Sequence, residues 1–183
     1  AGYPFWTDYS FTAAIKVPQS TTGQSNRIGM VFYRQDSSNY YLLKWSLKTF
    51  FLSASKLELI RVLDGKPQTI AETAIPGQTD QWYLAKVSVL GKRIRAFIDR
   101  RKIFDVEDSY AIGGKVGLYS EGSLAGYFDD IAVLSTQEFE FYKKDGTPDP
   151  ANIQTVNQAN SSFQFFGAPA WGSYLVTATA KAG

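Results

Sequence analysis

The sequence contains neither cysteine nor histidine. Without cysteine the chain can form no disulfide framework and no thiolate zinc site, and thiol usage says nothing about its redox compartment. Without histidine it lacks the base of Ser-His-Asp and Cys-His nucleophile systems and the commonest ligand of transition metals. The chemistry that remains is that of carboxylates and of hard cations, which bind oxygen ligands.

Long apolar runs and strong net charge are missing as well. No stretch approaches the roughly 18–20 apolar residues of a membrane span, and the N-terminus lacks the regions of a signal peptide, so an export signal would have been removed. The 19 basic and 17 acidic residues give a net charge of +2. Such a small charge does not steer nucleic acid or an anionic membrane to the protein. We therefore expect neither nucleic-acid binding nor membrane insertion.

The residues that are abundant predict an all-β protein. Aromatic residues make up 15% of the chain, and 15 glycines interrupt it at short intervals, a composition typical of many short strands. Apolar and polar residues alternate in segments such as 9–15, 82–90 and 93–99, and turn sequences such as Asp64-Gly65 join them. The pattern predicts an antiparallel β-sandwich of one main domain without helices.

The segment Arg27–Ser46, RIGMVFYRQDSSNYYLLKWS, predicts a β-hairpin with a polar tip. Alternation places Tyr41 and Trp45 on one side of its second strand, where aromatic rings could stack on a sugar while an arginine donates two hydrogen bonds. Core packing of the same rings is the alternative, because aromatic residues are favoured in any strand. The residues expected to form a glycan-binding face are Arg34, Asn39, Tyr41 and Trp45, with Tyr119 and Glu121 as neighbours.

The two ends of the chain resemble each other. Residues 1–18, AGYPFWTDYSFTAAIKVP, align without a gap with residues 166–183, FGAPAWGSYLVTATAKAG, with seven identities in 18 positions, and Trp6 recurs as Trp171. We interpret residues 1–137 as one unit of a tandem array and residues 138–183 as a linker and the start of the next. Because this tail is too short to bury a core, we expect its strands to pack on or complete the sandwich, or to mediate self-association.

Several motifs in order resemble the concanavalin A-like lectin/glucanase superfamily, and within it the laminin-G-like and carbohydrate-binding modules of bacterial secreted proteins. They are WTDYSFTAAIKV, the hairpin sequence given above, WYLAKVSVLGKRIRAFID and GKVGLYSEGSLAGYFDDIAVLS, which together span roughly residues 4–135. The resemblance implies a jelly-roll of two curved sheets whose concave face often holds a glycan. Arg100 stands where the hairpin of this family usually has glycine.

The resemblance also implies a structural Ca²⁺. In related jelly-rolls an aspartate of the last strand is a calcium ligand, which points first to Asp129 and then to Asp130 and Asp8. Adjacent carboxylates such as Asp129 and Asp130 repel unless they are solvated or bridged by a cation. The alternative is that these side chains cap backbone amides of loops.

Catalysis is not expected. Glu138 and Glu140 share one face of EFEFY, but the Glu-x-Asp-x-x-Glu strand of the hydrolases in this superfamily is absent, and a strand with a solvated acidic face explains the pattern. Basic residues at 92–102 form a cluster that could bind an anionic polysaccharide or could be an ordinary solvated surface.

The function expected from the sequence is that of a non-catalytic carbohydrate-binding or adhesion module, a lectin in the broad sense, of a larger exported or cell-surface bacterial protein. The partner would be a polysaccharide or another glycan. The alternatives are a structural repeat of a surface protein without a glycan ligand and, third, a glycoside hydrolase or polysaccharide lyase domain.

Overall fold

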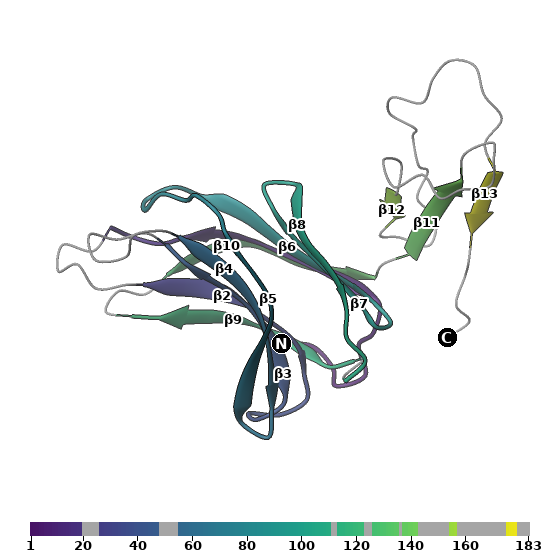
Figure 1. Cartoon of the computed structure of the whole chain (residues 1–183), viewed down its shortest axis with the longest axis horizontal. Helices are drawn as coiled ribbons and strands as arrows, with labels where there is room; N and C mark the ends of the chain where they lie inside the picture. Colours follow the sequence, from purple (N-terminus) through teal and green to yellow (C-terminus); the bar gives the residue numbers. More distant parts are fainter. Residues whose placement is uncertain are drawn as a thin grey trace, which may run out of the picture.

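The computed structural model describes residues 1–19, 26–47, 55–110, 113–122 and 126–135, together with three short strands within residues 137–178. The described residues contain strands and no helix, so none of them forms a helix that could span a membrane. Ten strands form two antiparallel five-stranded sheets packed face to face, as Figure 1 shows. The predicted all-β sandwich is confirmed.

The first sheet contains, in spatial order, β10 (Tyr127–Ser135), β1 (Tyr9–Lys16), β6 (Tyr83–Leu90), β7 (Arg93–Ile98) and β8 (Arg101–Glu107). The second sheet contains β5 (Lys66–Ala74), β4 (Lys56–Leu63), β3 (Tyr40–Ser46), β2 (Arg27–Arg34) and β9 (Lys115–Glu121). Each sheet thus combines strands from distant parts of the chain, because β10 pairs with β1 and β9 pairs with β2.

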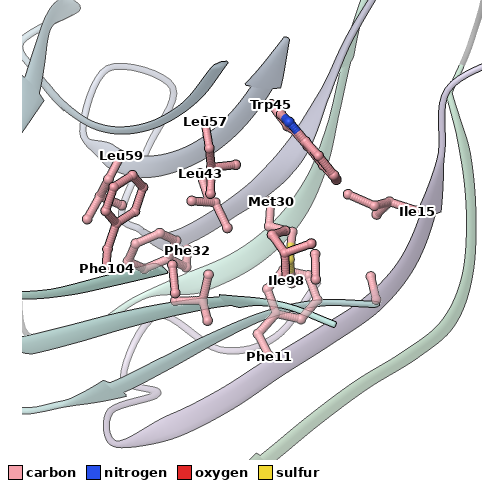
Figure 2. Close-up of a cluster of buried hydrophobic side chains, with 14 of the residues drawn as sticks. Phe11, Ile15, Met30, Phe32, Leu43, Trp45, Leu57, Leu59, Ile98 and Phe104 are labelled. Carbon is pink, nitrogen blue, oxygen red and sulfur yellow. The ribbon is translucent and has the colours of Figure 1, made fainter. Parts of the chain in front are cut away.

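The core lies between the sheets and follows from the alternation of apolar residues. Every second side chain of a strand points to the same face, so Phe11 and Ile15 of β1 meet Met30 and Phe32 of β2 across the interior. Figure 2 shows these side chains with Trp45 and other residues of the second sheet in one cluster. The buried cluster explains why this length of chain can form one stable domain.

The turn between β4 and β5 confirms the Asp-Gly prediction. Asp64 and Gly65 both adopt positive φ angles, 47° and 75°, which is the backbone of a type I′ turn. The Gly65 amide donates to the Ser38 carbonyl (2.9 Å), and the Asp64 amide donates to Oδ1 of Asn39 (3.1 Å). This turn therefore also holds the neighbouring turn between β2 and β3.

The turn between β7 and β8 has the same backbone without a glycine. Asp99 and Arg100 have φ angles of 48° and 68°, and Oδ1 of Asp99 accepts a hydrogen bond from the Leu84 amide (2.8 Å). A positive φ costs a residue with a side chain about 1–2 kcal/mol. The turn forms although Arg100 stands in place of glycine, and Arg100 occupies a strained position.

Replacing Arg100 with glycine is expected to raise the free energy of unfolding by about 0.5–1 kcal/mol, because relief of this strain exceeds the greater entropy of glycine in the unfolded chain. Urea denaturation measures the change. The matched variant is Arg101→Gly, in the first position of β8, which should lower stability by about 0.5–1 kcal/mol. Equal or lower stability of Arg100→Gly would show that the turn tolerates arginine without strain.

Two buried tyrosines link β1 to β2 near the start of β1. The Tyr33 amide donates to the hydroxyl of Tyr9 (3.0 Å), and the rings meet edge to face at 5.6 Å. Burial raises the pKa of Tyr9, and the hydrogen bond from the Tyr33 amide has a smaller, opposite effect. Burial also raises the pKa of Tyr33, and the nearby Tyr9 and Asp8 raise it further. Both hydroxyls therefore stay protonated in the folded protein at pH values that ionise tyrosine in the unfolded chain.

Stability should consequently fall in alkaline solution. Since the folded-state pKa lies above the unfolded value of 10.0, the contribution is complete below pH 10 and is lost as the pH rises toward the folded pKa. At pH 11 the loss should be about 1.4 kcal/mol for each tyrosine. Urea denaturation between pH 9 and about pH 11 measures it, and the Tyr33→Phe variant should show about half the loss. An equal loss in wild type and variant would contradict the assignment to Tyr33.

The segment after residue 136 forms strands of its own. β11 (Gln137–Tyr142) pairs with β12 (Gln154–Val156) and with β13 (Leu175–Ala178) in a separate three-stranded sheet. Trp171 and most of the predicted linker lie outside the described residues. The division at residue 137, the tandem repeat and the self-association of the tail stay predictions.

Candidate functional site

The outer face of the second sheet is the surface of β9, β2, β3 and β4 that points away from the core. In antiparallel sheets residues directly opposite each other share a face, and the register places Gly117, Val31, Leu42 and Ile60 in one row across these strands. Leu42, Ile60 and Val62 are only 5–6% exposed and pack against Val31, Tyr40 and Tyr119. The centre of this face is therefore apolar, with two half-buried tyrosines.

A polar cluster lies at the β9 side of the same face. Arg27 and Glu121 are paired across β2 and β9, and a guanidinium nitrogen of Arg27 contacts Oε1 of Glu121 at 2.6 Å. The Tyr119 hydroxyl donates to Oε2 of Glu121. The Glu121 side chain is 48% exposed. A ligand can therefore reach a carboxylate whose orientation is fixed by two neighbours.

The electrostatics of the cluster agree with this geometry. The hydrogen bond from Tyr119 and the charge of Arg27 lower the pKa of Glu121, so its carboxylate is ionised at neutral pH. Burial and the bond to Glu121 raise the pKa of Tyr119 to about 12, so the hydroxyl keeps its proton. The cluster thus offers a cation, an anion and an aromatic ring beside an apolar surface.

Two glycines adjoin Tyr119 on this face. Gly29 lies directly opposite Tyr119, and a Cβ atom there would meet the Leu43 carbonyl oxygen at 2.1 Å, so no larger residue fits without moving a strand. Gly117 is the next residue of β9 on the same face. The face consequently has no side chains at two positions adjoining Tyr119, which keeps this part of the surface flat.

A second charged network on this face is internally paired. Glu58 accepts from Lys44 (3.0 Å) and Lys56 (3.2 Å), and Lys56 also reaches Glu72 (2.8 Å). These contacts join β3, β4 and β5. Each carboxylate has a cation within ion-pair distance, so the network is explained by strand pairing and needs no ligand.

Two of the residues predicted to bind a ligand lie in the core instead. Trp45 is 1% exposed and contacts the Tyr83 ring of the first sheet, with 4.8 Å between centroids, and Tyr41 is fully buried. The prediction that these rings form a binding face is therefore wrong. The alternation was correct, but the side that it defined faces the first sheet, where large rings fill the space between the layers.

Arg34 and Asn39 lie at one end of the sandwich, away from Tyr119. The Asn39 side chain donates to both oxygens of Asp36 (3.1 and 3.0 Å) and accepts from the Asp64 amide, so it stabilises two turns. Arg34 is half-buried at the end of β2, seven residues from Arg27, or roughly 23 Å along the strand. Of the six predicted residues, Tyr119 and Glu121 are the two that the structure joins on the outer face of the second sheet.

Sequence reasoning missed Arg27, Tyr40 and Lys44, which lie on the other side of the hairpin. The side carrying Tyr40, Leu42, Lys44 and Ser46 mixes apolar and polar residues, whereas the side with Tyr41, Leu43 and Trp45 is uniformly apolar. A mixed side is typical of a surface that faces solvent. That difference was present in the sequence and could have identified the outer face.

The three aspartates predicted to bind calcium do not come together. Asp8 precedes β1 and accepts the Gly91 amide (2.6 Å), whereas Asp129 pairs with Ala14 near the other end of β1 and accepts the Asp130 amide (2.8 Å). Within the described part of the chain, no group of three or more metal-ligating side chains converges. The arrangement does not fit a calcium cage, and Ca²⁺ binding stays a prediction that rests on the resemblance alone.

Comparison with known proteins gives matches only at the level of structure. No family model matches the sequence, and no curated protein matches it. A carbohydrate-binding module, CBM66 from Bacillus subtilis, superposes with a TM-score of 0.60 and 19% identity over 70% of this chain and 75% of the module. Sheep galectin-11 in complex with glycerol superposes with a TM-score of 0.54 and 11% identity over 71% of this chain and 92% of the galectin.

Enzymes share the same architecture. A glycoside hydrolase family 16 endo-glucanase from Bacteroides ovatus superposes with a TM-score of 0.51 and 9% identity over 70% of each chain. At sequence identities this low, a superposition shows that two proteins share a fold and does not assign an activity. The two-sheet part of this chain therefore has the concanavalin A-like jelly-roll fold that the sequence motifs predicted.

Proposed function

We propose that the protein is a carbohydrate-binding module that holds its ligand on the outer face of the second sheet. The observation that carries the proposal is the cluster of Arg27, Tyr119 and Glu121 at the edge of an apolar surface. A sugar presents hydroxyl groups at its rim and C–H groups on its faces. The charged pair can hydrogen-bond the hydroxyls while Tyr119 and Tyr40 contact the apolar face.

The fold supports this proposal. Of the proteins with the same architecture, one is named as a carbohydrate-binding module, another is a galectin and a third is an endo-glucanase. The paired carboxylates Glu58 and Glu72 are both bonded to Lys56, an arrangement that suits strand pairing better than acid–base catalysis. We therefore propose a non-catalytic module, belonging to a larger exported bacterial protein.

The test is a glycan array followed by calorimetry with the best ligand. Glu121→Gln should weaken binding about tenfold because it removes the charge that accepts hydrogen bonds from sugar hydroxyls. Tyr119→Ala should weaken it about fivefold to tenfold through loss of ring contact. The matched controls are Glu107→Gln and Tyr110→Ala, which alter exposed side chains elsewhere and should bind like wild type.

The outcomes separate the alternative functions. Failure to bind any glycan would favour the structural repeat of a surface protein. Release of reducing sugar from a bound polysaccharide would favour a hydrolase, and formation of an unsaturated product would favour a lyase. Equal binding by Glu121→Gln, Tyr119→Ala and their controls would place the ligand on another surface.

A further inference from the structure

The outer face of the first sheet carries a second group of exposed aromatic side chains, on the opposite side of the sandwich. Trp82, just before β6, is 44% exposed, and Tyr127, the first residue of β10, is 53% exposed. Lys16 ends β1 and pairs with Tyr127 across the ladder. The neighbours Ile15 and Phe128 pack in the core, so Lys16 and Tyr127 point outward.

Lys16 is held between the two rings. Its Nζ atom lies 5.0 Å from the Trp82 centroid and 4.7 Å from the Tyr127 centroid, the distances of cation–π contacts. No carboxylate of the described residues forms an ion pair with it. The rings therefore fix the position of the ammonium group while its charge stays without an anionic partner in the described part of the protein.

A second cation–aromatic pair lies on the same face. The Nζ atom of Lys86 on β6 is 5.4 Å from the ring centroid of Phe97 on β7. Lys86 pairs with Thr12, so it lies roughly 14 Å from Lys16, four residues along β1 and one strand across. Leu84, 37% exposed, lies between them on β6. The face thus presents two separated cations joined by apolar surface.

The charges around Lys86 favour an anion. Burial and the neighbouring Arg95 lower the pKa of Lys86, so an anion bound there would favour its charged form. Three basic residues of the cluster predicted at 92–102 are less available. Arg93, Arg95 and Lys102 all converge on Asp105, at 2.8, 3.4 and 2.7 Å. That cluster is therefore partly neutralised, and Lys16 is a better contact for an anion than these three residues.

We propose that Lys16, Trp82 and Tyr127 form a binding site for an acidic polysaccharide, which continues over Leu84 to Lys86 and Phe97. A carboxylate or sulfate group of the polymer pairs with Lys16, and the adjoining sugar ring lies against Trp82 or Tyr127. The apolar surface between the two lysines suits sugar C–H groups. Nucleic acid suits this face less, because closely spaced phosphates need more cations than two lysines supply.

Calorimetry with two probes tests the site: hexagalacturonate, which carries carboxylates, and a heparin hexasaccharide, which carries sulfates. Lys16→Met keeps the aliphatic stem and removes the charge, and Trp82→Ala removes one ring. Each variant should weaken binding of the preferred probe about tenfold. In the Lys16→Met variant the affinity for the probe should also depend less on the salt concentration. Lys66→Met, an exposed lysine of the second sheet, is the matched control and should bind like wild type.

This site lies on the opposite side of the sandwich from the outer face of the second sheet. The Tyr110→Ala variant, which removes an exposed ring elsewhere, should bind both probes like wild type. Wild-type affinity of Lys16→Met, or an equal loss in Lys66→Met, would overturn the proposal. Tighter binding of single-stranded oligonucleotide than of either probe would overturn it in favour of nucleic acid. A dimer in sedimentation that Trp82→Ala abolishes would instead make this face an interface between copies of the chain.

Discussion

Replacing Trp45 with alanine is expected to lower the free energy of unfolding by about 3–5 kcal/mol. The side chain is 1% exposed and lies in the core between the sheets, as Figure 2 shows, with its ring edge-to-face against Tyr83. Gly77 packs so closely that a Cβ atom there would lie 2.5 Å from the indole. Close packing on several sides leaves few ways for the site to collapse, so a large cavity should remain.

Two variants calibrate this result in urea denaturation. Trp82→Ala removes the same side chain from a surface position that is 44% exposed, and should cost less than about 1 kcal/mol. Trp45→Phe should cost less than Trp45→Ala, because it keeps a ring and removes an indole N–H that has no partner among the described residues. If Trp45→Ala has near-native stability but has lost glycan binding, Trp45 contacts the ligand and is not a core residue.

Replacing Asp108 with alanine should lower the free energy of unfolding by about 3–4 kcal/mol. Oδ1 of Asp108 accepts the Tyr41 hydroxyl at 3.0 Å, and its two oxygens accept Arg61 at 2.9 and 2.8 Å. Asp108 is 9% and Arg61 22% exposed at the side chain. Without the carboxylate, a largely buried guanidinium and a buried hydroxyl each lose an acceptor, which costs more than the pair itself contributes.

A double-mutant cycle separates the pair from the other contacts of Asp108. Arg61→Met removes the charge, and the double variant should be more stable than the sum of the single losses predicts, by about 1–3 kcal/mol. Asp108→Asn should lie between wild type and alanine because its amide oxygen still accepts a hydrogen bond. Additive losses would show that Arg61 and Asp108 do not interact in solution. A loss below about 1 kcal/mol in Asp108→Ala would show that water replaces the carboxylate.

The structure of residues 1–18 shows which positions of the proposed repeat are buried and which are exposed. Tyr9 and Ala13, two of the matching positions, are 2% and 0% exposed in the core, and Trp6 packs against that core. Tyr3 and Phe5, which are 60% and 72% exposed, are replaced by alanine in residues 166–183. Three of the seven shared positions thus lie in or against the core, whereas the shared Pro4 is exposed and the core residue Phe11 is not shared. The tandem repeat stays a prediction.

Local regularities in the sequence were enough to predict the strands and many of the turns. Period-two alternation depends only on neighbouring residues, and so does the preference of Asp64-Gly65 for positive φ angles. The order of the motifs then indicated the concanavalin A-like fold. The sidedness of β3 was correct, because alternation separates the two faces of a regular strand. In β2 the alternation fails at Tyr33, whose φ angle of 48° goes with its burial in the core beside Phe32.

Only the tertiary structure decided which distant strands meet. Tyr41 and Trp45 are core residues because the first sheet covers the uniformly apolar side of β3, and no local pattern states which sheet will cover that side. Arg27 meets Glu121 because β2 pairs with β9, across 94 residues of chain. Lys16 lies between Trp82 and Tyr127 because β1 is flanked by β6 and β10. Each candidate site is built by pairing between distant strands, which alternation within a strand does not specify.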